Sequence, residues 1–466
     1  MAPPSSSPNV TILSKFVAYP DSNSTIGDLK LSVSDLPMLS CHYIQKGLFF
    51  SPPPIPITHL LSNLLSSLSA ALTIFPALAG RFTTRPDGVI AISCVDAGVD
   101  FFHAAAPGLT LASLLPPDSD VPAPVRRLFP MECTVSYEGH LRPLAAFQLT
   151  ALGDGAVFIG AAVNHAVVDG TSFWNFFNTW AALCRGDDGA LSPPDFRRNY
   201  FGKSTAVLLF PGGAGPAVTF PADAPVRERF FHFSGAAIRE LKVTANRRIT
   251  KLAANDRESE VYGKSIHDHK EAAAKDGEIS SFQALCAQIW RSTTRARRQL
   301  PSDATTTFRM AVNCRHRVNP PVLANYFGNA IQSVATRAAV GEVARSGIEH
   351  TAALLHRSVA AHGDGAVRRA VAEWEAAPRC FPLGNPDGAG VTMGSSNRFP
   401  MYDGNDFGWG KPVTVRSGKA NKFDGKMSAF PGRDGGGSVE VEVCLAPETM
   451  EALIQDEEFM YYVSKE

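Results

Sequence analysis

The 466-residue sequence lacks an excess of charge of either sign, because its 44 lysines and arginines balance its 44 aspartates and glutamates. A balanced charge gives no overall field to attract nucleic acid or an anionic membrane, so we expect neither as a partner. The sequence also lacks a run of about 20 apolar residues, the length that spans a bilayer. Its first residues, MAPPSSSPNVTILSKF, lack the charged and apolar segments of a signal peptide. We therefore expect no membrane span and no secretion signal.

Paired cysteines are missing as well. The eight cysteines lie far apart, and no two of them form a C-x-x-C pair. This spacing argues against zinc-ribbon and thioredoxin-like proteins and favours free thiols in a cytoplasmic protein. Coiled-coil heptads are also missing, which together with the zero net charge favours a monomer. The composition that remains, 45% hydrophobic and 19% charged, is typical of a globular chain long enough for two domains.

Apolar periodicity predicts the elements of the first half. Leucines at helical spacing predict an amphipathic helix over 58–73. The apolar run Val157–Val163 predicts a buried strand, and aromatic residues at helical spacing predict a helix over Gly170–Cys184. His165 would then lie just after a strand, in a short turn that leads into a helix.

The second half is predicted in the same way. Residues 244–278 are charged and poor in apolar side chains, so we expect an exposed, mobile loop there. Ser280 and Gln283 form a capping-box pattern, which predicts the start of a helix. Thr307–Asn313 is expected to be a strand, and the alternation of valine and glutamate over Val439–Val443 predicts a half-buried strand.

This mixture of strands and helices predicts an α+β protein of two domains. We expect an N-terminal domain over 1–190, a crossover linker over 191–226 and a C-terminal domain over 227–466. The linker is predicted from composition, because prolines and glycines gather between 185 and 226.

His165 is the leading candidate for a catalytic residue. Its predicted position lets the ring project into a cleft rather than a core. An unperturbed imidazole has a pKa of about 6.5, so it is largely neutral at cytosolic pH and can take a proton from an attacking hydroxyl or amine. The sequence has no G-x-S-x-G elbow and no cysteine in a nucleophile signature. Direct attack is therefore favoured over a covalent acyl-enzyme.

Asp169 follows that histidine by four residues and has two interpretations. It could orient His165 as the third member of a triad. It could instead accept backbone N–H groups at the start of the next helix, or pair with a buried arginine, and we favour this structural role. A metal site at His165 and Asp169 lacks a third ligand at a recognisable spacing, so we expect no metal.

A second motif, Asp406-Phe407-Gly408-Trp409-Gly410, lies far downstream, and its pairing with the histidine motif resembles the plant BAHD acyltransferases. The resemblance extends over nearly the whole chain and is closest to the little-characterised acetyltransferase-like branch of that family. Five further blocks follow the order found in the family: LSVSDLPMLSCHYIQKG at 31–47, FPALAGRF at 75–82, RPLAAFQLT at 142–150, SSFQALCAQIWR at 280–291 and NYFGNAIQSV at 325–334.

The resemblance implies two chloramphenicol-acetyltransferase-like domains with a solvent channel between them. An acyl-CoA would enter as co-substrate from one face and a small acceptor from the other, with His165 midway and no bound cofactor. By the same resemblance, Asp406 is a structural carboxylate bonded to Arg315 or Arg317, although some descriptions of the family make it a second proton acceptor. Trp409 would either donate its indole N–H to the developing oxyanion or pack as an ordinary aromatic in the glycine turn.

Candidate CoA contacts also follow from the resemblance. Ser280 and Ser281 lie at a predicted helix N-terminus, where free N–H groups favour phosphate, although Ser280 could serve only as the helix cap. Ser395, Ser396 and Arg398 are expected along the pantetheine arm. A basic cluster is expected to form a solvated loop rather than a phosphate site, and its members are Arg416, Lys419, Lys422 and Lys426.

Two departures from the family pattern bear on the acceptor. Hydroxycinnamoyl-shikimate enzymes carry a Ser-Trp pair where this chain has Ser395-Ser396, which argues against shikimate or quinate as the acceptor. Asn164 precedes His165 where a second histidine is common in that branch. Neither change removes the predicted base.

Transfer of an acyl group from acyl-CoA to a hydroxyl or amine is the favoured function. One alternative is a lyase acting on an isochorismoyl-glutamate-like adduct, since some relatives on this fold are lyases. Such a protein need not keep a base at the centre of the channel, whereas His165 is present here. The other alternative is a non-catalytic partner of a lipid elongase, which would need the fold without the chemistry.

Overall fold

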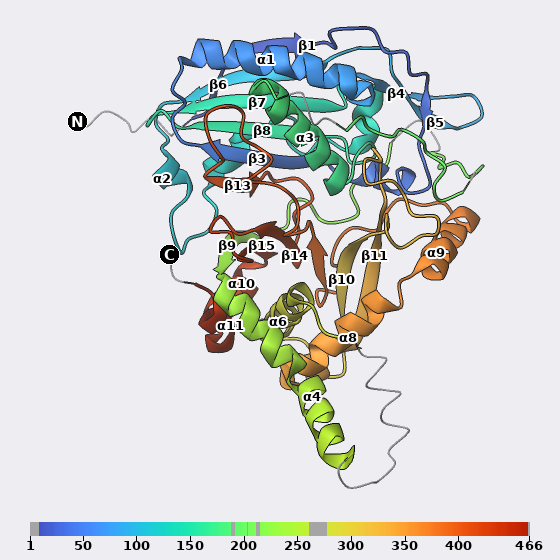
Figure 1. Cartoon of the computed structure of the whole chain (residues 1–466), viewed down its shortest axis with the longest axis vertical. Coiled ribbons are helices and arrows are strands. Elements are labelled where there is room, and N and C mark those ends of the chain that lie inside the picture. Colours follow the sequence, from blue (N-terminus) through green and yellow to red (C-terminus); the bar gives the residue numbers. More distant parts are fainter. Residues whose placement is uncertain (1–8, 188–191, 203, 211–214, 261–276, 465–466) are drawn as a thin grey trace.

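Two six-stranded mixed sheets lie one above the other and form the body of the protein (Figure 1). The structure is a computed structural model, and it describes residues 9–187, 192–202, 204–210, 215–260 and 277–464. A three-stranded sheet is added to the first half, with the order β2 (Leu29–Lys30), β5 (Ile90–Ser93), β4 (Arg81–Thr84).

The first sheet carries the strand that leads to His165. Helices α1 (Ile57–Ile74) and α3 (Gly170–Cys184) pack against it, and their apolar side chains share one core with it. Its strand order is β1 (Thr11–Ala18), β6 (Val99–Ala106), β7 (Ala145–Leu152), β8 (Val157–Val163), β3 (Ile44–Phe50), β13 (Thr414–Ser417).

The second sheet has helices on one face and the first half of the molecule on the other (Figure 1). Its strand order is β11 (Ile331–Ala339), β10 (Thr305–Asn313), β12 (Val391–Gly394), β14 (Lys426–Pro431), β15 (Val439–Leu445), β9 (Arg227–Phe233). The covering helices are α4 (Gly235–Glu260), α6 (Ser281–Ala296), α8 (Ile348–Ala360), α10 (Pro447–Ile454) and α11 (Glu457–Tyr462).

Short helices complete the connections. The α-helical ones are α2 (Leu111–Leu114), α7 (Val340–Arg345) and α9 (Asp364–Ala376). The 3₁₀ turns are η1 (Leu36–Ser40), η2 (Pro76–Ala79), η3 (Ala123–Leu128) and η4 (Ser136–His140).

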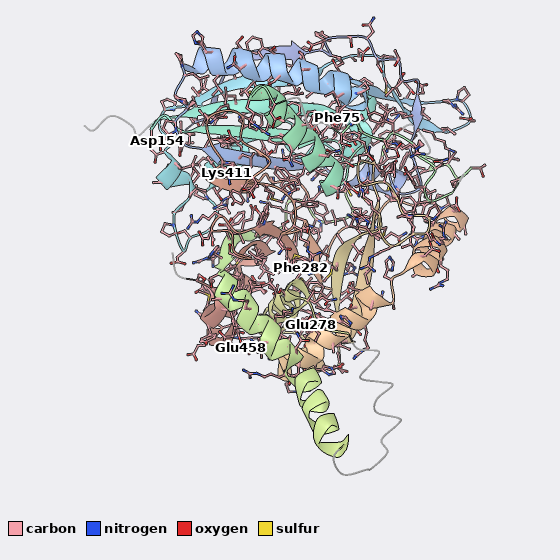
Figure 2. The ribbon with its side chains drawn as sticks, viewed as in Figure 1. Phe75, Asp154, Glu278, Phe282, Lys411 and Glu458 are labelled. Atoms are coloured by element: carbon pink, nitrogen blue, oxygen red, sulfur yellow. The ribbon has the colours of Figure 1, made fainter. Side chains whose placement is uncertain are left out.

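One segment of the C-terminal half crosses back to the first sheet. Strand β13 pairs antiparallel with β3, and Lys411, just before it, lies beside the first sheet in Figure 2. Phe407 packs edge-on against Trp180 of α3, with ring centroids 5.0 Å apart. This segment therefore ties the two sheets together, since the other strands of the first sheet lie before residue 164 and those of the second sheet lie after residue 226.

The predicted elements of the first half are confirmed. The 58–73 helix is α1, whose leucines Leu60, Leu64 and Leu68 are fully buried. Strand β8 and helix α3 have the predicted bounds. By length and composition, α1 is the one described helix that could cross a membrane, but its leucine face packs in the core beneath the first sheet.

Two predictions for the second half are wrong. Residues 244–260 continue helix α4 instead of forming a loop, because alanine, arginine, lysine and leucine favour helix. The rest of the expected loop, 261–276, lies outside the described residues. Strand β15 is buried on both faces, not half-buried, because its glutamates face the other half of the molecule instead of bulk water.

Candidate active site

A tightly bonded turn presents His165 at the end of β8. The buried Asn164 donates from Nδ2 to the Ser136 carbonyl at 2.7 Å, and its Oδ1 accepts the Ala166 N–H at 2.9 Å. The backbone N–H of His165 reaches Ser136 Oγ at 3.2 Å. The Asn164 amide therefore stabilises the turn, so the role of this residue is structural and not catalytic.

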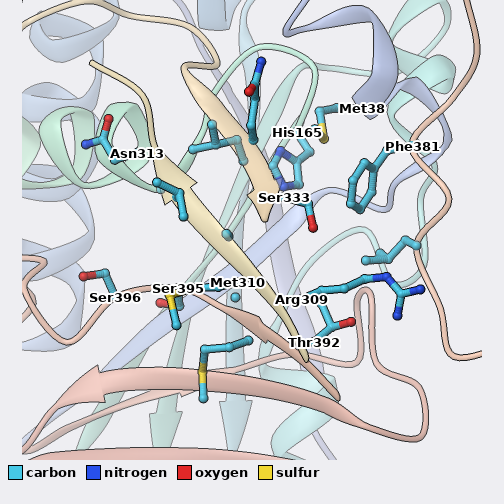
Figure 3. A pocket seen from close by; sticks show the side chains of 18 of the residues that line it. Met38, His165, Arg309, Met310, Asn313, Ser333, Phe381, Thr392, Ser395 and Ser396 are labelled. Carbon is cyan, nitrogen blue, oxygen red and sulfur yellow. The ribbon is translucent and has the colours of Figure 1, made fainter. Parts of the chain in front are cut away.

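The imidazole itself faces a large cavity between the two halves (Figure 3). The cavity has a volume of about 1550 Å³ and is lined by residues of both sheets. A single drug-sized ligand occupies a pocket of about 300–1,000 Å³, so this space suits two substrates. Nδ1 of His165 is buried, so we infer that Nε2 is the ring nitrogen directed toward the cavity.

Burial also sets the protonation state of this ring. Loss of water lowers the pKa of His165 below its ordinary value of 6.5, and the nearby Lys426 ammonium lowers it further. The backbone of the same turn and the Asp169 carboxylate raise the pKa but offset only part of this effect. The imidazole is therefore neutral at neutral pH, as a proton acceptor must be.

Asp169 anchors the turn to the second half of the chain. Its two carboxylate oxygens receive Arg315 Nη1 at 2.6 Å and Nη2 at 3.1 Å. The same carboxylate caps α3 through the Ser172 N–H and accepts the Ala330 N–H. Burial alone would raise the pKa of Asp169, but Arg315 and these hydrogen bonds hold it below its ordinary range. None of these contacts involves the His165 ring, which agrees with the structural role expected for Asp169.

A second buried network holds the backbone of His165. Asn329 Nδ2 donates to the His165 carbonyl at 2.8 Å and to Asp35 Oδ1 at 3.0 Å. Asp35 in turn pairs with Arg198 at 2.8 Å. Sequence reasoning missed these residues as functional support. Asp35 and Asn329 lie in two of the blocks that resemble the family, and that was the only available signal.

The predicted partner of Asp406 is wrong. Arg315 is occupied by Asp169, and Arg317 donates to two backbone carbonyls near α8, at 2.8 and 2.9 Å. Asp406 Oδ1 instead accepts the N–H groups of Gly408 and Gly410 within its own loop, at 2.8 and 3.0 Å. Both glycines have φ near +110°, a region closed to other residues, which explains their spacing in the motif.

Trp409 lies outside the cavity lining, and its indole Nε1 is buried without a hydrogen-bond partner among the described residues. Its ring packs against Phe50 and Phe407, with centroids 5.3 and 5.8 Å apart, in the core of the first half. Neither Trp409 nor Asp406 lines the cavity that holds His165. The motif is therefore a structural turn that closes the first half, and the packed-aromatic interpretation of Trp409 fits it.

Most of the candidate CoA residues do line the cavity. Ser395, Ser396 and Arg398 follow β12 into it, as Figure 3 shows for the two serines. Ser280 also lines it and caps α6 through a capping box with Gln283, as predicted. Ser281 lies outside the cavity lining.

The expected basic loop is largely buried. Lys422 and Lys426 line the cavity, and Lys422 is 8% exposed. The prediction of a solvated loop was wrong because the loop folds under β3, not outward. Within the described parts of the chain, no three histidine, cysteine or acidic side chains lie close enough to hold a metal ion.

The relatives of the chain match it over almost its whole length. The model of the Transferase family matches residues 8–460. BAHD acyltransferase DCR of Arabidopsis thaliana is 34% identical over 92% of this chain and 88% of its own length. The chain belongs to the BAHD acyltransferases. Uncharacterized acetyltransferase At3g50280 of the same plant is 33% identical, with 97% and 99% of the two chains covered.

The fold of this BAHD acyltransferase agrees with that family. The crystal structure of vinorine synthase superposes with a TM-score of 0.74 at 21% identity, covering 98% of this chain and 99% of the other. The architecture is therefore the expected pair of chloramphenicol-acetyltransferase-like domains. Members of the family transfer acyl groups from acyl-CoA, so the cavity is the place where such a transfer would occur.

Loss of the Asp169 carboxylate is expected to destabilise the enzyme strongly. Asp169→Ala leaves Arg315 buried without its counter-charge, which typically costs about 3–5 kcal/mol. Urea denaturation followed by tryptophan fluorescence measures the change. Asp403→Ala, which breaks the exposed ion pair with Lys411, is the matched control and should leave the denaturation midpoint unchanged. Equal stability of the two variants would contradict the role of the buried pair.

Asp406 should behave as a structural hydrogen-bond acceptor. Asp406→Ala removes both bonds to the glycine turn and should lower stability by about 1–3 kcal/mol. Asp406→Asn keeps an oxygen at the same position and should retain most of the melting temperature and the activity. Thermal unfolding of the two variants tests this. A stable but inactive Asp406→Asn enzyme would instead favour a role in proton transfer.

Proposed function

We propose that His165 is the general base of an acyl-CoA-dependent acyltransferase. Nε2 takes the proton from a hydroxyl or amine of a small acceptor while that group attacks the thioester carbonyl in a ternary complex. The carbonyl carbon gains the acceptor's oxygen or nitrogen, and CoA leaves as the thiol after taking a proton. The observation that carries this proposal is a neutral imidazole facing a cavity with room for both substrates.

Direct attack is supported by the state of the thiols near His165. Cys41 and Cys380 line the cavity. Burial raises the pKa of Cys41 to about 12 and also raises that of Cys380. A thiol with a raised pKa is a poor nucleophile at neutral pH. A covalent acyl-cysteine intermediate is therefore disfavoured.

The CoA moiety is proposed to follow the edge of the cavity formed by β10, β11 and the start of α6. Cations cluster there, where Arg309, Arg317 and Arg337 line the cavity together with Ser280. Ser395, Ser396 and Arg398 would contact the pantetheine arm as it approaches His165. All eight cysteines are free thiols, which supports a reducing cytoplasmic location, and we propose a monomer.

His165→Ala should abolish turnover and spare the fold. Removal of a general base costs about 10²–10⁴-fold in rate. CoA should still raise the melting temperature of the variant, because a ligand that binds only the folded state stabilises it. Product formation by mass spectrometry, with acetyl-, malonyl-, benzoyl- and coumaroyl-CoA against alcohols and amines, measures the loss. Full activity of His165→Ala would overturn the proposal.

The activity should depend on pH in a defined direction. The base works only when neutral, and burial lowers its pKa. Activity should therefore fall on the acid side, with the midpoint of kcat against pH below 6.5. Initial rates at saturating substrate, measured about every half pH unit between about pH 4.5 and pH 8, give this midpoint. A midpoint above 6.5 would contradict a desolvated His165 as the base.

A further inference from the structure

One end of the cavity carries more positive than negative charge. Lys46 of β3, Lys426 of β14 and Lys422 line it beside the carboxylate of Glu442. On β14 and β15 the cavity-facing residues alternate with apolar ones that face the helices, so the polar side chains are aimed into the cavity. This lysine end, defined as Lys46, Lys422, Lys426 and Glu442, is assigned no substrate contact in the mechanism above.

The carboxylates at the lysine end are already occupied. Lys422 Nζ lies 2.6 Å from Glu228 Oε2 and 2.8 Å from Glu442 Oε1. The remaining oxygen of Glu228 receives Arg126 at 2.5 Å, and that of Glu442 receives Ser417 Oγ at 2.5 Å. Lys422 is thus paired with both carboxylates, and each of their four oxygens already accepts one donor.

Lys46 and Lys426 are the cations left over. In the described parts of the chain, neither ammonium group has an ion pair or a hydrogen bond to a carboxylate. Lys46 Nζ lies over the Phe430 ring, 4.3 Å from its centroid. Lys426 Nζ lies directly against the backbone of Gly394, where even a methyl group would clash. Both side chains are partly exposed, and the surface that they expose lines the cavity.

The two ammonium groups are held in place. Asn421 exchanges hydrogen bonds with His42 at 2.9, 3.0 and 3.2 Å, which fastens the lysine-bearing loop to the strand that carries Lys46. Asp424 receives Arg297 Nη2 and Asn385 Nδ2, both at 2.9 Å. Both lysines therefore start from a framework that is fixed before any ligand arrives, so an anion would gain two cations at little ordering cost.

Electrostatics favour an anion at this place. Burial lowers the pKa of Lys46 to about 8, and burial also lowers the pKa of Lys426. The Lys426 ammonium also lowers the pKa of both Lys46 and His165, so its positive charge acts on the other lysine and on the site. Glu442 is a nearby carboxylate that offsets part of the effect of burial at both lysines, and a bound carboxylate would offset more of it.

We propose that Lys46 and Lys426 bind a free carboxylate carried by one of the two reactants, either the acceptor or the acyl group. This inference rests on the proposed function, because it places the reactant beside the base. The phosphates of CoA are a poorer fit, since the pantetheine arm keeps them away from the thioester. In the second sheet, β12 separates β14 and the lysine end from β10 and β11, where the arginines lie.

Binding measurements without turnover test the proposal. In a His165→Ala background, isothermal titration compares malonyl-CoA with acetyl-CoA, which tests the acyl source. With CoA bound, 4-hydroxybenzoate and 12-hydroxydodecanoate are compared with their methyl esters, which tests the acceptor source. In at least one arm the carboxylate should bind more tightly, and Lys46→Met or Lys426→Met should each weaken it about tenfold or more. The uncharged ligand should be unaffected.

The controls separate the possible outcomes. Lys419→Met removes a cation of the same loop that does not line the cavity, and it should change no affinity. Because methionine keeps the length of lysine without its charge, the two test variants should melt no lower than their parent. If no carboxylate is preferred in either arm, or if the lysine variants leave the preference intact, the proposal fails. If the lysine end selects carboxylates but the wild-type protein transfers no acyl group, the binding proposal is supported and the proposed function is rejected.

Discussion

The ion pair between Asp169 and Arg315 is the interaction on which the site depends. It joins a turn of the first sheet to a segment that follows β10 of the second, so both halves must be in register before His165 can take its place. Both side chains are almost wholly buried. A buried pair of this kind contributes little net stability over apolar packing, but loss of either partner is costly. Its value here is positional, because it fixes where the base lies relative to the other wall of the cavity.

The same principle recurs in the other cross-connections. Asn329 bonds the His165 carbonyl from the second half, Asn421 bonds His42 from the loop before β14, and β13 extends the first sheet. Each contact spans well over a hundred residues of sequence. The cavity is therefore bounded by two cores that are joined both by these polar bonds and by apolar contacts, since Phe327, Phe407 and Phe430 pack in the core of the first half. Such a construction leaves a large space open without weakening either core.

The bounds of helices and strands were predicted best where a single physical effect determines them. Helical and strand periodicity gave the bounds of α1, β8 and α3, because burial against one sheet decides all three. Alternation misled at β15, where a glutamate every second residue indicates a wet face. Here that face meets a cavity, and Glu442 is buried beside Lys422. A polar residue at every second position indicates polar surroundings, but it does not distinguish water from polar groups of the protein.

The site was only partly predictable for the same reason. His165 and Asp169 lie within one turn, so local reasoning reached them and suggested the arginine partner in general terms. Which arginine pairs with which aspartate depends on long-range packing. The resemblance assigned Arg315 or Arg317 to Asp406, whereas the structure pairs Arg315 with Asp169. The Asp406 turn instead satisfies itself through two glycine N–H groups. A conspicuous motif can thus be structural, while an inconspicuous segment such as NKFDGK supplies charges to the cavity.

The polar groups around the cavity differ in whether they are already satisfied. Asp169, Asp35, Glu228 and Glu442 each have a cation in contact, and Arg315, Arg198 and Lys422 each have a carboxylate. These ion pairs are internal to the protein and fix the shape of the site. His165, Lys46 and Lys426 are different, because they line the cavity and form no ion pair with a carboxylate in the described parts of the chain. Stability of the fold does not require desolvated polar groups that lack a partner in the protein, whereas ligand binding and proton transfer do.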